Sequence, residues 1–275
     1  MLTGWTMKSK TYEGTCGCEP DFVHRHGNGV EVDCVNMDHY ARQCPNPPFS
    51  PLLAEALYKK VLGDTMRYGD PDAVSVTMLS GCPRKQWYER RNSFVEDPLE
   101  RRWMLRGTFA HEGILGACIG PRFLIEQAIR ISVGSGSLYG TFDAYDMELA
   151  HLHDLKTQMY WAIERKIKAK KSDIAKDIFV KDNILQVQIY GMMLKHKLGL
   201  IPMKSFLHYL NGDLRWVTVQ VPKAEGYTFS EVLEGADKRI TYLKGDDPTA
   251  LPPREYGKFN PREASPVWYL IKETM

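Results

Sequence analysis

The pattern of apolar side chains changes partway along the chain, and this change limits the fold more than any other feature. Residues 123–131 alternate between apolar and polar side chains, which is typical of a half-buried β-strand. Residues 138–146 and 151–157 indicate two further strands, and Ser135-Gly136 indicates a turn between the first two. Because segments with helical spacing precede and follow these strands, the pattern predicts an α/β domain with a mixed sheet flanked by helices.

The elements around the three strands follow from spacing and turn signals. Asn211-Gly212-Asp213 predicts a hairpin. The hydroxyls from Ser75 to Thr77 are suitable N-caps for a helix that continues through Tyr88. The other expected elements are helices at 51–62, 98–118, 184–198 and 229–243, and hairpin strands at 203–210 and 214–221.

Composition is that of an ordinary globular protein. The 275 residues allow one large domain, or one domain with a small appendage. Hydrophobic residues make up 43% and charged residues 25%, which excludes a disordered, collagen-like or coiled-coil chain. We expect no membrane span, no secretory signal and therefore a cytoplasmic location, because no long apolar run occurs. The net charge of +2 neither requires nor excludes a nucleic-acid partner.

Four of the six cysteines lie within the first 44 residues, with three histidines among them. In a reducing cytosol such crowding favours metal binding over disulfides. Residues 1–50 contain too few apolar side chains for a core, so we expect a small Cys-rich N-terminal module held by a structural Zn²⁺, followed by a main domain at 51–275. An iron–sulfur cluster and free thiols are the alternatives. The expected ligands are Cys16, Cys18, Cys34 and Cys44, with His24, His26 and His39 as substitutes.

The triplet Asp154-Leu155-Lys156 lies in the third expected strand. Residues two apart on a strand point to the same face, so Asp154 and Lys156 project together while Leu155 enters the core. The carboxylate can hold a hard divalent cation, and the lysine can orient or help deprotonate the attacking water. Asp143 on the neighbouring strand can supply a second carboxylate. We expect these residues at an exposed strand end, where the alternative is an ordinary surface ion pair.

The order of these residues resembles a known family. Gly107-Thr108-Phe109-Ala110-His111-Glu112 precedes Gly140-x-x-Asp143, and Asp154-Leu155-Lys156-Thr157 and Gln186-x-x-x-Tyr190 follow. The segment from Thr77 to Lys85 is similar to the one that opens the same core. Together the motifs resemble the RecB-type branch of the PD-(D/E)XK nuclease superfamily, closest to the CRISPR-associated RecB-like exonucleases and their phage and viral relatives. The resemblance covers roughly residues 75–245.

The resemblance implies a restriction-endonuclease-like PD-(D/E)XK core and a role for each matched residue. His111, Asp143, Asp154 and the backbone carbonyl of Leu155 would be ligands of a catalytic Mg²⁺ or Mn²⁺. Lys156 would be the catalytic lysine. Taken alone, His111 would more often be a packed or surface histidine.

The resemblance also assigns residues outside the metal site. Gln186 and Tyr190 lie four apart on one helix face, and in the family such a pair faces the active site and contacts DNA or the lysine. Glu126 is a further acid that could extend the cluster.

Arg84 and Lys85, in a basic run, are candidates for DNA contacts, with a solvated helix face as the alternative.

One feature of the family is absent from the sequence. Many relatives bind an iron–sulfur cluster through one cysteine beside the Pro-Arg-Lys segment and three near the C-terminus. Cys82 matches the first, but residues 259–271 contain no cysteine. The family cluster therefore cannot form in the usual way, and we interpret Cys82 as a small buried residue.

These observations lead to one main functional prediction. The chain is expected to be a Mg²⁺- or Mn²⁺-dependent DNA nuclease, and the exonuclease type is favoured over the endonuclease type. It would act in DNA recombination, repair or CRISPR-like processing in a bacterial or archaeal cell. A homo-oligomer or a recombination or CRISPR partner protein would fit this setting. The alternatives are a structure-specific endonuclease and a non-catalytic zinc-containing nucleic-acid-binding protein on a nuclease fold.

Overall fold

The computed structural model divides the chain into two compact units. The core unit comprises Pro71–Pro83 and Arg106–Pro252, and the second unit comprises Met1–Asp70, Arg84–Leu105 and Pro253–Met275. The structure describes residues 2–6, 33–34, 52, 70–81, 83–91, 94–96, 98–158, 162–164, 178–211, 213 and 215–246. The expected boundary near residue 50 and all but Leu52 of the expected helix at 51–62 lie outside these ranges.

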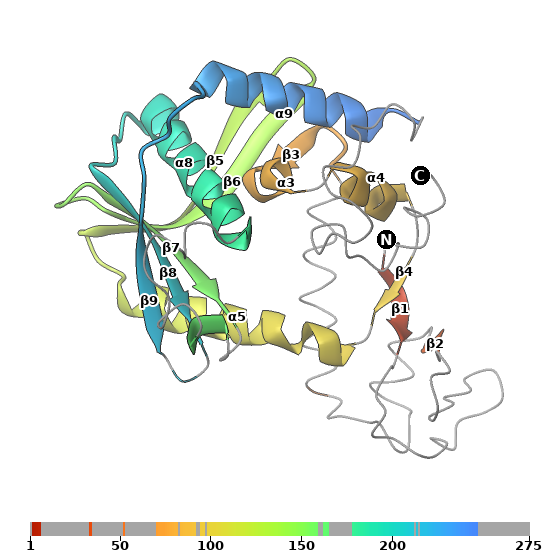
Figure 1. Cartoon of the computed structure of the whole chain (residues 1–275), viewed down its shortest axis with the longest axis horizontal. Coiled ribbons are helices and arrows are strands. Elements are labelled where there is room, and N and C mark those ends of the chain that lie inside the picture. Colours follow the sequence, from red (N-terminus) through yellow and green to blue (C-terminus); the bar gives the residue numbers. More distant parts are fainter. Residues whose placement is uncertain are drawn as a thin grey trace. The chain divides into compact units, whose positions relative to one another are not determined.

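A six-stranded mixed sheet forms the centre of the core unit (Figure 1). Its order is β3-β6-β7-β8-β9, and β5 pairs with β6. The pairs β3–β6 and β7–β8 are parallel, and the others are antiparallel. This confirms the predicted mixed sheet flanked by helices. The strands are β3 (Ala73–Ser75), β5 (Phe123–Val133), β6 (Gly136–Asp146), β7 (His151–Thr157), β8 (Lys204–Leu210) and β9 (Trp216–Val221).

One edge of β6 is only partly paired. β5 pairs along almost the whole of β6, from Gly136 to Asp146. On the other edge, β3 pairs with residues 137–139 and β7 pairs with residues 144–146. Among the described residues, 140–143 therefore have no strand partner on that edge. The sheet contains a gap there, between β3 and β7.

Helices lie on both faces of the sheet. Successive side chains of a strand point to opposite faces, and β8 shows this at its end. The Tyr209 hydroxyl accepts a hydrogen bond from Asn183 of α8 (Ile178–Leu198), whereas Leu210 packs in the core with Leu115 of α5 (Pro98–Ala117). The sheet thus separates α8 from α5, as Figure 1 shows.

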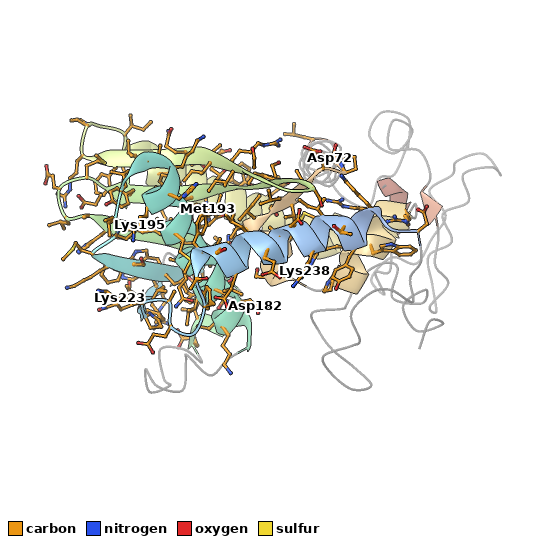
Figure 2. The ribbon with its side chains drawn as sticks, turned by 90° about the horizontal axis from the view of Figure 1, so that it is seen from above. Asp72, Asp182, Met193, Lys195, Lys223 and Lys238 are labelled. Atoms are coloured by element: carbon orange, nitrogen blue, oxygen red, sulfur yellow. The ribbon has the colours of Figure 1, made fainter. Side chains whose placement is uncertain are left out.

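The two long helices on the α8 side bury one stripe each. In α8, Met193 is fully buried while Lys195 is exposed, and Figure 2 labels both. The helix α9 (Phe229–Lys244) begins with a capping box, in which Thr228 and Glu231 bond each other's backbone N–H groups. Its buried residues recur every three or four positions: Val232, Ala236, Ile240 and Leu243.

The helix expected from Ser75 through Tyr88 is two helices. Ser75 caps α3 (Val76–Ser80), which ends at Gly81, and α4 (Pro83–Arg91) begins two residues later. Proline favours the first position of a helix and disfavours helical geometry in the residue before it. Gly81 and Pro83 therefore end one helix and begin another.

A small sheet belongs to the second unit. Its order is β2-β1-β4, with β1 antiparallel to β2 and parallel to β4. The strands are β1 (Leu2–Thr6), β2 (Asp33–Cys34) and β4 (Phe94–Glu96). Across the described parts of both units, no helix has an apolar stretch of the length that a bilayer span requires.

Candidate functional site

Strands β6 and β7 diverge where the gap in the sheet begins. They pair only through Ala144–Asp146 and His151–His153, and beyond that point Asp143 lies between them. The Asp143 Oδ2 atom accepts a hydrogen bond from the backbone N–H of Leu155 at 2.5 Å. This bond replaces the next rung of the ladder and fixes the carboxylate of β6 beside the backbone of β7.

Helix α5 adds an imidazole to the same place. The His111 Nε2 atom lies 2.9 Å from the carbonyl oxygen of Leu155, and its Nδ1 atom lies 3.8 Å from Asp143 Oδ1. One turn earlier, a Cβ atom at Gly107 would lie 2.9 Å from Thr157 Oγ1. The absence of a side chain at Gly107 therefore lets α5 lie close to β7, which brings His111 to the strand.

Asp154 and Lys156 project together from β7, as their spacing predicts. The Lys156 Nζ atom lies 2.8 Å from Asp154 Oδ2. The expectation of an exposed strand end is wrong, because Asp154 is only 2% exposed and the Lys156 side chain 23%. The structure thus brings His111, Asp143, Leu155 and this ion pair together, from three elements far apart in the sequence.

The charges of the cluster act strongly on one another. Burial, helped by the nearby charge of Asp154, raises the pKa of Asp143 to about 6, against the opposing effects of Lys156 and His111. Burial alone would lower the pKa of Lys156, but the charges of Asp154 and Asp143 outweigh it and raise that pKa. Lys156 is therefore a cation at neutral pH and not a proton acceptor.

A second group from α8 joins the cluster. The Gln186 side-chain amide donates hydrogen bonds to the Tyr190 hydroxyl and to Thr77 Oγ1, both at 3.2 Å. A Cβ atom at Gly140 would lie 2.5 Å from a ring carbon of Tyr190, so the ring packs directly against the face of β6 at this glycine. Burial raises the pKa of Tyr190, whose phenol is also close enough to feel the charge of Lys156.

The donor atoms of the cluster suit a hard divalent cation. Two carboxylates, an imidazole and a backbone carbonyl are the ligand types that Mg²⁺ and Mn²⁺ accept. Burial, and after it the charge of Asp154, raises the pKa of Asp143, and a bound cation would offset both effects. Among the described residues, no three His, Cys, Asp or Glu side chains already surround a common metal position. In this conformation His111 is bonded to Leu155 and Asp154 to Lys156, so these groups would have to turn towards an ion.

The other sequence-predicted residues lie beside this cluster or outside the described residues. Glu126 is exposed on β5 with a left-handed φ of +48°. It lies opposite Asp143, between the residues of β5 that pair with Ala144 and Phe142, and its role stays a prediction. Arg84 and Lys85 lie in α4, and Cys34 lies in β2, but their side chains are outside the described part of the structure. The remaining candidates outside it are Cys16, Cys18, Cys44, Cys82, His24, His26 and His39.

Sequence reasoning missed two groupings. Thr77 was expected only as a helix cap, whereas its hydroxyl bonds Gln186, 109 residues away. The His153 Nδ1 atom lies 2.9 Å from His208 Nε2, and burial together with the neighbouring imidazoles lowers the pKa of His153 to about 4. Both contacts join segments distant in sequence, so no local pattern could have indicated them.

Comparisons with known proteins leave the family open. No family model matches the chain, and neither does any characterised protein. One solved structure with a similar arrangement is the crystal structure of SSO0001, with 18% sequence identity and a TM-score of 0.47. The similarity covers 67% of this chain and 83% of that chain. A likeness this distant identifies neither the family nor the function.

Proposed function

We propose that the chain is a metal-dependent nuclease that hydrolyses phosphodiester bonds in DNA, on a PD-(D/E)XK core. The observation that supports this most is the cluster of Asp143, Asp154, Lys156 and His111 around the backbone of Leu155. A surface ion pair would not need a second, half-buried carboxylate and an imidazole beside it. The order of the motifs in the sequence, which resembles RecB-type nucleases, supports the same function.

In this proposal the ligands of one or more Mg²⁺ or Mn²⁺ ions would be Asp143, Asp154, His111 and the Leu155 carbonyl. Such an ion, when bound, would act as a Lewis acid that polarises the phosphodiester and favours ionisation of the attacking water. The two carboxylates bring negative charge close together where little water reaches it. Binding of a divalent cation would neutralise this charge, which water cannot do. Imidazole ligation favours Mn²⁺ somewhat more than Mg²⁺.

Lys156 has a separate role in the proposed reaction. The carboxylates keep it protonated, so it acts as a fixed positive charge. It stabilises the negative charge that develops on the phosphoryl oxygens and orients the attacking water by hydrogen bonding. In the metal-free conformation the ammonium group contacts Asp154 at 2.8 Å.

The test is a cleavage assay with the purified full-length chain. End-labelled linear DNA and closed circular DNA of the same sequence are incubated with Mg²⁺, with Mn²⁺ or with excess EDTA. We expect cleavage with either ion and none with EDTA. Loss of the linear substrate alone indicates an exonuclease, and cutting of the circle indicates an endonuclease. DNA binding without any cleavage would favour the non-catalytic alternative.

A further inference from the structure

Three histidines lie on the face of the sheet opposite Asp154 and Lys156. His151 and His153 are two residues apart on β7, so their side chains point to the same face, away from Asp154. The neighbouring strand β8 adds His208, whose register partner on β7 is Leu155, another residue of this face (Figure 1). The reaction proposed above uses none of these three imidazoles.

Two of the three imidazoles already face each other. The His153 Nδ1 atom lies 2.9 Å from His208 Nε2, and the two ring centroids are 5.2 Å apart. Two nitrogens that each bind one tetrahedral Zn²⁺ at about 2.0–2.1 Å lie about 3.3 Å from each other. The pair would therefore have to separate by only about 0.4 Å to hold an ion between them.

A hydroxyl on the next strand orients His208. Its register partner on β9 is Thr218, and the Thr218 Oγ1 atom lies 3.0 Å from His208 Nδ1. When the Nδ1 proton is donated to this oxygen, the Nε2 atom directs its lone pair towards His153. A hydrogen bond from the second ring nitrogen is the usual way in which a protein orients a metal-binding histidine. His208 is thus already prepared as a ligand.

His151 can supply a third nitrogen from the same strand as His153. Their ring centroids are 6.1 Å apart, whereas rings bound to one tetrahedral ion lie about 5 Å apart. The His151 side chain would therefore have to rotate, which agrees with the finding that no three ligand side chains among the described residues yet surround one position. Asp146, opposite His151 on β6, is held by Arg122 at 2.7 Å and stays outside the site.

We propose that His151, His153 and His208 form a binding site for Zn²⁺, separate from the proposed Mg²⁺ or Mn²⁺ site. Three imidazoles without a carboxylate favour Zn²⁺ over Mg²⁺, and they leave the fourth tetrahedral position to water. On binding, His153 changes to its other neutral tautomer, in which the proton is on Nε2 and Nδ1 binds the metal. No net proton is released, and the ion links β7 to β8. This inference does not depend on the proposed nuclease function.

The site is open to solvent, which determines how it can be tested. All three histidines are half-buried, so the ion can exchange with the surrounding water. The site should therefore be filled when zinc is supplied and lose its zinc when the protein is purified without it. Zinc bound by four cysteine thiolates is held much more tightly and would remain.

The test measures how much further zinc the full-length chain binds after purification without added zinc. The protein is dialysed against a series of micromolar free Zn²⁺ concentrations in millimolar Mg²⁺, which competes for sites made of oxygen ligands. Zinc per chain is then measured by elemental analysis. The wild type is compared with His151→Gln, His153→Gln and His208→Gln. The control is His196→Gln, which replaces an exposed histidine on α8.

The wild type and the control should each bind about one further zinc ion per chain. Each of the other three variants should bind this ion at least roughly 100-fold more weakly, since even the loss of an orienting partner costs 10–100-fold in affinity. Thr218→Val removes only the orienting hydroxyl, so it should weaken binding roughly 10-fold and keep the same final zinc count.

Melting temperatures measured before zinc is added show which variants are folded. His151→Gln keeps the test decisive, because the described contacts of the His151 ring are with other rings and its loss breaks no described hydrogen bond. Equal zinc binding by the wild type and any folded variant of the three histidines would overturn the site. An equal loss in His196→Gln would overturn it too. Zinc at the N-terminal cysteines would be the same in every protein compared, so it does not affect the difference.

Discussion

At the scale of single residues, the carboxylate of Asp143 opposes folding of the metal-free chain when it ionises. Its pKa in the folded, metal-free chain is about 6, above the ordinary value of about 3.9 for an unfolded aspartate. A group whose folded pKa is raised opposes folding once it must ionise. The metal-free chain therefore loses stability as pH rises from about 4 to about 6, and the full penalty remains above that range.

Asp143→Asn should consequently raise the stability of the metal-free chain at pH 7, by about 1–2 kcal/mol. The amide oxygen can still accept the N–H of Leu155. Urea unfolding in excess EDTA at pH 7 and at pH 4 measures this. The gain should be present at pH 7 and small at pH 4. A variant less stable than wild type at pH 7 would contradict the view that the buried, ionised carboxylate opposes folding, and the same variant should fail to cleave DNA.

The ion pair on β7 leads to a second prediction about single residues. Asp154→Asn and Lys156→Met should each lower the rate of DNA cleavage roughly 100-fold or more, because each removes a group that stabilises charge in the transition state. Asp154 is buried, so circular dichroism and thermal melting must accompany the rates. Lys195→Met, an exposed lysine on α8, is the matched control and should cleave normally. Wild-type rates in both folded site variants would exclude this site.

The sequence predicted part of this site and missed part of it for physical reasons. Asp154 and Lys156 share a face because strands have a period of two, and this rule is local. His111 depended on the family resemblance, since nothing near it in the sequence indicates that it reaches Leu155. Thr77 could not have been found, because its partner Gln186 depends on how α3 and α8 pack.

At the scale of elements, the close packing of Tyr190 against β6 predicts which glycine is needed for stability. Gly140→Ala should lower the free energy of unfolding by about 1–3 kcal/mol, because the new methyl group would overlap the buried Tyr190 ring and lie 3.0 Å from Val76. It should also reduce cleavage, since the ring cannot keep its position. Chemical denaturation and the cleavage assay measure the two effects.

Gly116→Ala provides the matched control. Gly116 lies in α5, and a Cβ atom there would meet nothing within 4 Å. Alanine is favoured over glycine within a helix, so this variant should be as stable as wild type or more stable by up to about 1 kcal/mol. Equal destabilisation by both substitutions would show that the close contact at Gly140 is not what matters.

Elements were predicted best where periodicity alone determines them. The strand at His151–Thr157 and the helix at Phe229–Lys244 match expectation to within one residue. Helix α8 begins at Ile178 and not at residue 184, because the charged residues Lys181 and Asp182 interrupt the apolar pattern of its first turns. The division between α3 and α4 was missed although Gly81 and Pro83 both indicate it.

At the scale of the whole molecule, the N-terminal cysteines lead to a metal prediction that rests on sequence. Full-length protein should contain about one zinc per chain by elemental analysis and be colourless, whereas an iron–sulfur cluster would colour it brown. Cys34→Ser should release the zinc and make residues 1–50 sensitive to protease, since few apolar groups remain to stabilise them. The core unit should keep its melting transition.

Cys118→Ser is the control for this experiment. Cys118 is a free, half-buried thiol of the core unit, so its replacement should leave the zinc content unchanged. Protein that contains neither zinc nor iron, with an N-terminal region that resists protease, would refute the predicted structural metal site. The proposed nuclease site would be unaffected by that result, because it depends on other residues.

The alternation of side chains between the two faces of β7 also limits where the sequence can tolerate insertions and deletions. Odd-numbered residues such as Leu155 pack towards α5, and even-numbered residues such as Asp154 and Lys156 form the charged cluster. Inserting or deleting one residue within the strand would place the lysine in the apolar layer and the leucine in the cluster. Related genes should therefore vary in length at the turn formed by residues 147–150 but never inside the seven codons of the strand.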